Sequence, residues 1–528
     1  MIESVIITIN GKADAPDFSI HEGRLGFPVV CDADTPTAIT IRFSKEIKSF
    51  RNSTYQWNAP VGSVAGELSP KLLKLSDDCF VQASIASGTW EITDSHTLLW
   101  KFNQTEAAPI AEYKGETNEK FINRANRRID KIPALLFSYE NGIEFSRSPD
   151  SFRAVACFTD HCDYDTAENL QIQRELFQRC GLKVTKGFFL YHFSKRPDNA
   201  SYGRDASELE KWRADGHELA YHSLSQSIKD DYVGLKDFES FDPPFPDIPT
   251  YIDHGYQPYN LTLFRNSKLT EEIYSDTLAK KNITVLWNYI DCGTAGQGII
   301  NQMNPHQFTA SAFWKSTEGF PMKKRLAMMI KNLVFHTYAD RKLIRAYMNL
   351  ASSVKKILRE KKVSNLMDAT SKGFTLSRTG LRTLINWRRI KSKPYALAKY
   401  TPILFAHTIG GHQFQIFQTL EMIDFRKSLS EENLKMLVEE CGLFIAHTYF
   451  SAPFEYHTGR MIRNGKVDSV VEANFIRLGQ LIREGKIWNP TLSELVDYLT
   501  GYNDVECEVV SGRIVVKNSG NLHYRTVA

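Results

Sequence analysis

From residue 152 onward, short apolar runs alternate with amphipathic segments, and this alternation constrains the fold more than any other feature of the chain. The run FRAVACFT (152–159) is nearly continuous in apolar residues, as expected of a strand buried on both faces. A helix is predicted over 166–181, with Thr166 as its N-cap and Gly181 at its C-cap. Further strands are predicted at 184–191, 218–223, 249–254, 283–291, 402–408, 417–425 and 442–448. Strands that alternate with helices indicate a parallel sheet.

Polar residues follow these apolar runs at the points where the predicted strands end. They are Asp160, His161 and Asp163 after the first strand, and His222, Asp253, His254, Asp291, His407 and His447 after later ones. In a (β/α) barrel the C-terminal ends of the strands converge on one face, and that face holds the active site. The sequence therefore predicts an irregular (β/α) barrel with a rim of Asp160, His222 and His447.

The chain is too long for one ordinary domain, and we divide it into four parts. Residues 1–148 contain short β-prone runs separated by turn residues, which predicts a β-rich, sandwich-like domain. The barrel is predicted over 149–294 and resumes over 401–528, where a hairpin turned at Ser511 and Gly512 ends the chain. Between the two barrel parts, 295–400 is predicted to be a helical insertion.

This insertion is strongly basic. Residues 321–400 contain 20 Lys and Arg against 3 Asp and Glu, although the whole chain carries a net charge of only +4. Within 321–336, apolar residues share one helical face and basic residues flank it; the apolar ones are Leu326, Met329, Ile330 and Leu333. Two interpretations remain open: the stripe packs on the barrel, or the segment 321–395 makes peripheral contact with an anionic membrane.

The N-terminal sequence, the cysteines and the charge balance limit the compartment and the partners to be expected. The N-terminus has no basic segment followed by a long apolar run, and no window approaches 18 apolar residues, so a cytoplasmic protein is expected, at most peripheral at the inner membrane surface. The eight cysteines form no C-x-x-C pair, which favours free thiols in a reducing compartment. The acidic remainder of the chain and the absence of a nucleic-acid motif argue against a nucleic-acid partner.

Five segments appear in a recognisable order. They are ACFTDH (156–161), GHELAYHSLSQ (216–226), YQPYN (256–260), WNYID (287–291) and GLFIAH (442–447), the last followed by TLSEL (491–495). In this order the chain resembles the polysaccharide deacetylase family, the NodB-homology carbohydrate esterases, over roughly 150–500. The resemblance implies a metal-dependent, irregular (β/α) barrel.

The resemblance also implies roles for single residues. Asp160 takes the place of the general base, His222 that of a metal ligand and His447 that of the general acid. Three positions depart from the family. The second Asp of its first motif is His161 here, the second His of its second motif is Gln226, and the Arg of its third motif is Tyr256. Two repairs of the metal site remain open: His161 or Asp163 in place of the missing Asp, and His254 in place of the missing His. These ligand types suit one divalent ion, with zinc expected. Substrate contacts are predicted from Tyr259, Trp287, Asp291 and His407.

Three functions remain open from the sequence. The first is metal-dependent deacetylation of an acetylated sugar or polysaccharide precursor, with a place in envelope polysaccharide synthesis. The second is a decayed barrel that binds a glycan without chemistry. The third is another hydrolase or lyase on the same barrel, with Asp160 and Asp163 as paired carboxylates. Metal content separates the first from the second.

Overall fold

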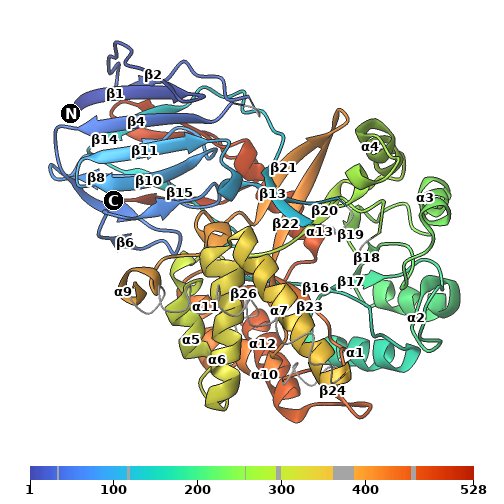
Figure 1. Cartoon of the computed structure of the whole chain (residues 1–528). Helices are drawn as coiled ribbons and strands as arrows, with labels where there is room; N and C mark the ends of the chain where they lie inside the picture. The colour runs from blue at the N-terminus through green and yellow to red at the C-terminus, as the bar shows by residue number, and fades with distance from the viewer. Residues whose placement is uncertain (33–34, 116–118, 256, 293–298, 361–385, 454–458) are drawn as a thin grey trace.

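The computed structural model describes residues 1–528 apart from 33–34, 116–118, 256, 293–298, 361–385 and 454–458. It contains a β-sandwich and a (β/α) barrel, with both chain ends at the sandwich (Figure 1). The predicted fold class is confirmed: a barrel of strands and helices, preceded by a β-rich sandwich and interrupted by a helical insertion. Tyr256, the predicted start of the insertion at 295–298 and its basic residues within 361–385 lie outside the described residues.

The sandwich packs two antiparallel sheets around one apolar core. One sheet has the order β2 (Lys12–Asp14), β1 (Ile2–Ile9), β4 (Thr37–Phe43), β11 (Thr97–Phe102), β10 (Thr89–Asp94), β7 (Val64–Ala65). The other has the order β3 (Arg24–Gly26), β14 (Ala134–Ser138), β9 (Phe80–Ala83), β8 (Leu72–Leu75), β5 (Ile47–Arg51), β6 (Trp57–Asn58). Alternation explains this packing, because Ile39, Ile41 and Phe43 of β4 are fully buried while Arg42 between them is exposed.

Within the described residues, seven parallel strands close the barrel. In spatial order they are β16 (Ala154–Asp160), β17 (Thr185–Phe188), β18 (Glu218–His222), β19 (Thr250–Ile252), β20 (Val285–Asp291), β22 (His412–Met422) and β23 (Leu443–Thr448). Strand β16 closes the ring because it pairs in parallel with both β17 and β23. Every residue of β16 is buried, as its continuous apolar sequence predicts. A short strand, β26 (Ile487–Trp488), also pairs with β16.

Helices surround the barrel strands: α1 (Ala167–Cys180), α2 (Tyr202–Ala214), α3 (Asp231–Ser240), α4 (Glu271–Lys280), α10 (Phe425–Ser428), α11 (Glu431–Glu439), α12 (Ser469–Arg483) and α13 (Leu492–Leu499). Helix α1 shows how local sequence sets their bounds. The Thr166 hydroxyl accepts a hydrogen bond from the Asn169 amide at 3.2 Å, and Gly181 ends the helix with φ of 70°. Both predicted caps are confirmed.

One predicted strand forms but does not belong to the parallel barrel. The segment 402–408 forms β21 (Leu404–Ile409), which is antiparallel to β22 and not part of the parallel ring. The two strands are joined by Gly410 and Gly411, both with positive φ, and a two-residue connection produces a hairpin, whereas parallel neighbours need a long crossover. His407 is therefore carried away from the C-terminal ends of the barrel strands.

The insertion between β20 and β21 is helical, as predicted. It contains α5 (Ala310–Ser316), α6 (Met322–Asn332), the π-helical segment η4 (Leu333–Tyr338), α7 (Arg341–Glu360) and α9 (Trp387–Ile390). Met329 of α6 packs with Ala310 and Phe313 of α5 in a small apolar cluster. Among the described residues, no helix is long and apolar enough to cross a membrane.

The end of the chain returns to the sandwich. Strands β27 (Glu506–Val510) and β28 (Arg513–Asn518) form the predicted hairpin, with Ser511 and Gly512 in the left-handed region that the turn requires. The Cys507 amide donates to the Ser84 carbonyl at 2.8 Å, and β29 (Tyr524–Val527) pairs with β15 (Gly142–Phe145). The predicted domain boundaries at 148, 294 and 400 stay predictions.

Candidate active site

Histidine and carboxylate side chains converge where the barrel strands end. His161 and Asp163 follow β16, and His222 is the last residue of β18. One potential ligand atom from each of these three residues lies within 4.8 Å of the others. His161 is 4% exposed and His222 only 1%, so the cluster is enclosed. The parallel register of the barrel explains this convergence, because it brings segments far apart in the sequence to the same rim.

His254, which follows β19, joins the cluster through Asp163. The two carboxylate oxygens of Asp163 lie 3.0 Å from His222 Nε2 and 2.9 Å from His254 Nδ1. The opposite nitrogen of His254 lies 2.8 Å from the Gln226 carbonyl, and that of His222 lies 3.5 Å from the Ile252 carbonyl. A carbonyl only accepts, so these outer nitrogens carry protons. Each inner nitrogen can face the Asp163 carboxylate only through a proton or a cation, and with a cation bound the ring would be neutral and its inner nitrogen a ligand. Metal-ligating histidines adopt this tautomer, so the donor set fits a divalent cation.

The electrostatics of the cluster agree with that fit. Burial lowers the pKa of His161 well below its usual range, and the neighbouring His447 and His222 lower it further. Burial also lowers the pKa of His222. For Asp163, burial is outweighed by His254 and His222, which hold its pKa well below the usual range. Burial lowers the pKa of His254, but Asp163 outweighs it and raises the value. The lowered pKa values of His161, His222 and Asp163 favour the neutral imidazoles and the ionised carboxylate that a metal ion requires of its ligands.

His447, at the end of β23, forms a second pair with Asp291 at the end of β20. Its Nδ1 lies 3.2 Å from Asp291 Oδ1, and Thr419 donates to the same oxygen at 2.7 Å. Burial works against a charged ring, but Asp291 outweighs it and raises the pKa of His447. The buried Nε2 of His447 has no hydrogen-bond partner in the described part of the chain, and its ring centroid lies 4.0 Å from that of His161. This imidazole therefore presents an unpaired Nε2 beside the cluster, and its role as general acid stays a prediction.

Aromatic rings form the wall of the site. The ring of Trp287 lies 4.7 Å from that of His161 and 4.9 Å from that of His447. Tyr449 lies 5.2 Å and 5.0 Å from the same two rings, and Tyr289 lies 5.0 Å from Trp287. Tyr289 has φ of 57°, and the register of β20 against β22 shifts between Trp287 and Asp291. A bulge of this kind re-aims side chains, and here it leaves both Trp287 and Asp291 beside His447.

Asp160, the predicted general base, lies behind the cluster and is fully buried. Its Oδ1 accepts from the Thr448 hydroxyl at 2.8 Å and the Phe450 amide at 3.0 Å, and its Oδ2 forms an ion pair with Lys186. Burial raises the pKa of Asp160 to about 6, although Lys186 lowers it. Both oxygens are thus occupied by protein groups. This arrangement suits a residue that positions His161, and the catalytic role of Asp160 stays a prediction.

Two predicted substrate contacts need correction. Tyr259 is 2% exposed and its ring stacks on Phe238 at 5.2 Å, within the apolar core outside the barrel wall. His407 Nδ1 accepts from the Asn126 amide at 2.8 Å, on the hairpin strand that turns away from the rim. The structure brings the predicted Trp287 and Asp291 to the cluster, and leaves Tyr259 and His407 elsewhere.

The sequence analysis did not single out Lys186, Asp165, Gln173 or Tyr449, which lie at or behind the cluster. Lys186 pairs with Asp160 and Asp165 in full burial, and also donates to Gln173 Oε1 at 2.8 Å. The lysine within the apolar run VTKGFFLY (184–191) was the available signal, because a charge in a strand buried on both faces needs a partner. Tyr449 gave no comparable signal.

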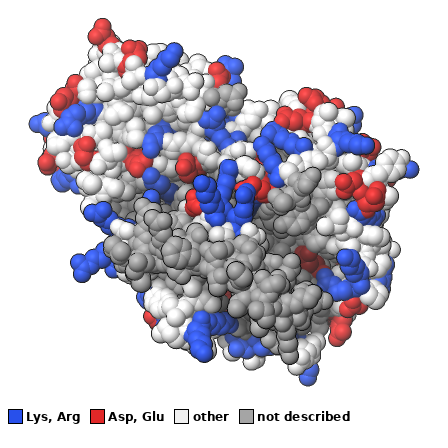
Figure 2. Space-filling view, in the orientation of Figure 1, with Lys and Arg blue, Asp and Glu red and all other residues white. Residues whose placement is uncertain are grey.

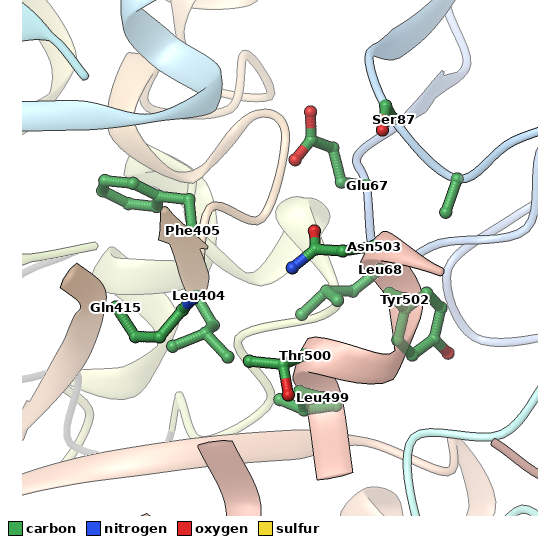
Figure 3. Close-up of a pocket in the computed structure, with 11 residues that line it drawn as sticks. Glu67, Leu68, Ser87, Leu404, Phe405, Gln415, Leu499, Thr500, Tyr502 and Asn503 are labelled. Carbon is green, nitrogen blue, oxygen red and sulfur yellow. The ribbon is translucent and has the colours of Figure 1, made fainter. Parts of the chain in front are cut away.

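A separate hollow lies between the sandwich and the barrel, level with the start of β20 and β22, and so away from the cluster (Figure 3). Its volume of about 20 Å³ has room for a single water molecule. Its lining comprises Glu67, Leu68, Ala86, Ser87, Leu404, Phe405, Gln415, Leu499, Thr500, Tyr502 and Asn503. The Glu67 carboxylate at its edge is held by Arg127 at 2.6 and 2.7 Å. This hollow is too small for a substrate.

Comparisons with known proteins place the chain in no family. No family model and no curated protein matches it. A GH31 dextranase from Flavobacterium johnsoniae, solved with isomaltotriose, is 7% identical, with 92% of this chain and 62% of the dextranase covered and a TM-score of 0.28. A xylosidase from Aspergillus niger is 11% identical, with 54% of this chain and 41% of that chain covered and a TM-score of 0.20. The chain thus spans about three-fifths of the dextranase.

These findings contradict the predicted membership in the polysaccharide deacetylase family. The solved structures named above are a dextranase and a xylosidase, and no family model supports the five-motif resemblance. Deacetylation, and with it the place in envelope polysaccharide synthesis, is withdrawn as the activity. The motifs matched because apolar strands that end in Asp or His recur in many barrels. At these TM-scores the likeness assigns no activity, and the description of the fold rests on the strand order of the chain itself.

Proposed function

We propose that the chain is a metal-dependent hydrolase that acts on a saccharide, with its active site at the cluster of His161, Asp163 and His222. The observation that carries this proposal is the approach of one ligand atom from each of these residues to within 4.8 Å. His254 completes the donor set through its contact with Asp163. A divalent ion bound there would supply Lewis acidity and make a water molecule acidic enough to attack near neutral pH.

In this proposal the proton of the attacking water would pass to solvent, and the protein supplies the proton of the leaving group. His447 donates a proton from Nε2 to the leaving group, and Asp291 keeps the ring charged and oriented through Nδ1. Asp160 holds the segment that carries His161 and does not itself contact the substrate. The buried surroundings strengthen the attraction between His447 and Asp291, because few water molecules screen it.

The saccharide part of the proposal is supported by the aromatic wall. Tyr289 and Tyr449 are partly exposed and lie on either side of the Trp287 and His447 rings. Rings that combine an apolar face with a polar tip suit a sugar, which has apolar faces and a polar edge. A few polar groups that converge within an aromatic wall are also the usual composition of a small-molecule site.

Metal content and hydrolysis test the proposal together. Purified wild type is expected to hold about one divalent ion per chain, zinc first among the candidates, and His222→Ala to hold almost none. His217→Gln is the matched control, since His217 is a buried histidine near the same strand but outside the cluster. Release of reducing sugar from a panel of oligosaccharides and aryl glycosides should stop with chelator and return with added zinc.

The outcomes separate the parts of the proposal. Wild type that binds no divalent ion, or His222→Ala with an unchanged metal content, would overturn the metal site. A bound ion without hydrolysis of any glycan would overturn the hydrolase, and glycan binding without chemistry would then be tested by affinity electrophoresis on the same saccharides.

A further inference from the structure

Helix α6 exposes a row of large apolar side chains to solvent. Met322, Leu326 and Ile330 are 57%, 50% and 49% exposed, and their spacing of four residues places them on one helical face. The helix is attached at the edge of the same face, where Met329 is 6% exposed and packs on α5. The face predicted from the sequence is therefore divided, and its exposed part is a stripe that the described residues leave uncovered. Single exposed apolar residues are ordinary, but a contiguous row marks a contact surface.

The charged residues of α6 all have one sign. Lys323 and Lys331 are exposed on the same helix, and α6 contains no acidic residue. Arg325 is turned away, because its guanidinium stacks on Trp314 at 4.2 Å and donates to the Trp314 carbonyl at 3.2 Å. On the sandwich and the barrel, the face seen in Figure 2 carries both basic and acidic side chains. The exposed surface of α6 thus combines apolar side chains with positive charge.

Only some partners satisfy both features. A nucleic acid would pair with the lysines but would leave Met322, Leu326 and Ile330 in water. An apolar groove on another protein would cover the stripe but offers no reason for the missing acidic residues. The boundary between headgroups and acyl chains of an anionic bilayer accepts the apolar side chains and attracts the lysines.

We propose that α6 docks the protein on an anionic lipid surface, with Met322, Leu326 and Ile330 inserted at the headgroup boundary. Lys323 and Lys331 then lie among the anionic headgroups, as the ends of long side chains do at an interface. This surface is formed by the insertion and shares no residue with the cluster of His161, Asp163 and His222. The inference is independent of the proposed hydrolysis.

Co-sedimentation of the full chain with vesicles tests it. The probes are vesicles of phosphatidylcholine alone and of phosphatidylcholine mixed with phosphatidylserine, each at low and high salt. Wild type should sediment only with the mixed vesicles, and less at high salt. The pair Leu326→Ser and Ile330→Ser should reduce partition about ten-fold, and the pair Lys323→Gln and Lys331→Gln by a similar factor.

A matched control comes from two helices outside the insertion, α11 and α12. Ile476 on α12 is 50% exposed and Lys435 on α11 is 73% exposed, so Ile476→Ser with Lys435→Gln removes the same kinds of group outside the insertion. This control should sediment like wild type, and circular dichroism checks that all variants fold. Wild type in the supernatant at low salt would overturn the proposal. Loss of binding in the lysine pair but not in the apolar pair would also overturn it, since the surface would then be a general polyanion site.

Discussion

The buried lysine at the back of the site offers the sharpest test of how the site is held. Lys186 is 0% exposed, and its ammonium group contacts Asp160, Asp165 and Gln173, which are also buried. Burial lowers the pKa of Lys186, but the two carboxylates outweigh it and raise the value, so the group is charged. Lys186→Met keeps the apolar stem and removes the ammonium. It leaves two carboxylates, 0% and 1% exposed, without their counter-ion. Removing one partner of a buried ion pair costs about 3–5 kcal/mol of unfolding free energy.

Urea unfolding at two pH values gives the measurement. The destabilisation of Lys186→Met should be larger at pH 8 than at pH 5, because the orphaned carboxylates can take up protons only at the lower pH. In wild type the pKa of Asp160 is already raised to about 6, so loss of Lys186 moves it further upward. Adding Asp160→Asn to Lys186→Met should recover roughly 1 kcal/mol or more, since one buried charge is removed.

Lys183→Met is the matched control. Lys183 lies three residues earlier and pairs with Glu494 at 2.6 Å, but both side chains are more than 40% exposed. Its loss should cost less than about 1 kcal/mol. If Lys186→Met is within 1 kcal/mol of wild type at pH 8, or if the two lysine variants behave alike, the argument from buried charge is refuted.

Three further predictions concern other parts of the barrel. Burial lowers the pKa of His217 to about 4, so the unfolded state binds more protons between about pH 6.5 and 4 and stability is lost as pH falls through that range. His217→Phe should remove this loss, worth about 3 kcal/mol at pH 4, in thermal unfolding scans across pH. Gly479→Ala should destabilise the protein by about 1–3 kcal/mol, because the added Cβ collides with the Cys180 backbone oxygen where α12 meets α1; unchanged melting would contradict that close approach. Asp291→Asn should lower the pKa of His447, because Asp291 is the group that raises it. NMR titration of the ring measures this pKa, and an unchanged value would show that Asp291 does not control it.

Much of the barrel could be predicted from local sequence. Strands β16 and β23 are nearly continuous apolar runs, and such runs are typical of strands buried on both faces. The caps of α1 depend only on Thr166 and Gly181, which act within one helical turn of themselves. The same locality explains the correct turn at Ser511 and Gly512.

The pairing of strands required the tertiary structure. An apolar run does not show whether the neighbouring strand is parallel or antiparallel, and the prediction for 402–408 was a parallel barrel strand. In the structure Gly410 and Gly411 turn the chain, and β21 pairs antiparallel with β22. His407 was misplaced with it. Tyr259 was misplaced for a related reason, since a resemblance between motifs does not tell on which side of the barrel wall an aromatic ring lies.

The sequence by itself determined which side chains stand at the ends of strands, among them His161, Asp163, His222 and His447, because strand ends are read from local patterns. Only the tertiary structure decided that three of them lie within 4.8 Å of one another, and that Asp160 pairs with Lys186 behind the cluster. Lys186 lies 26 residues from Asp160. Contacts of this kind depend on barrel closure, which sums weak pairings over the whole chain, and no single segment encodes them.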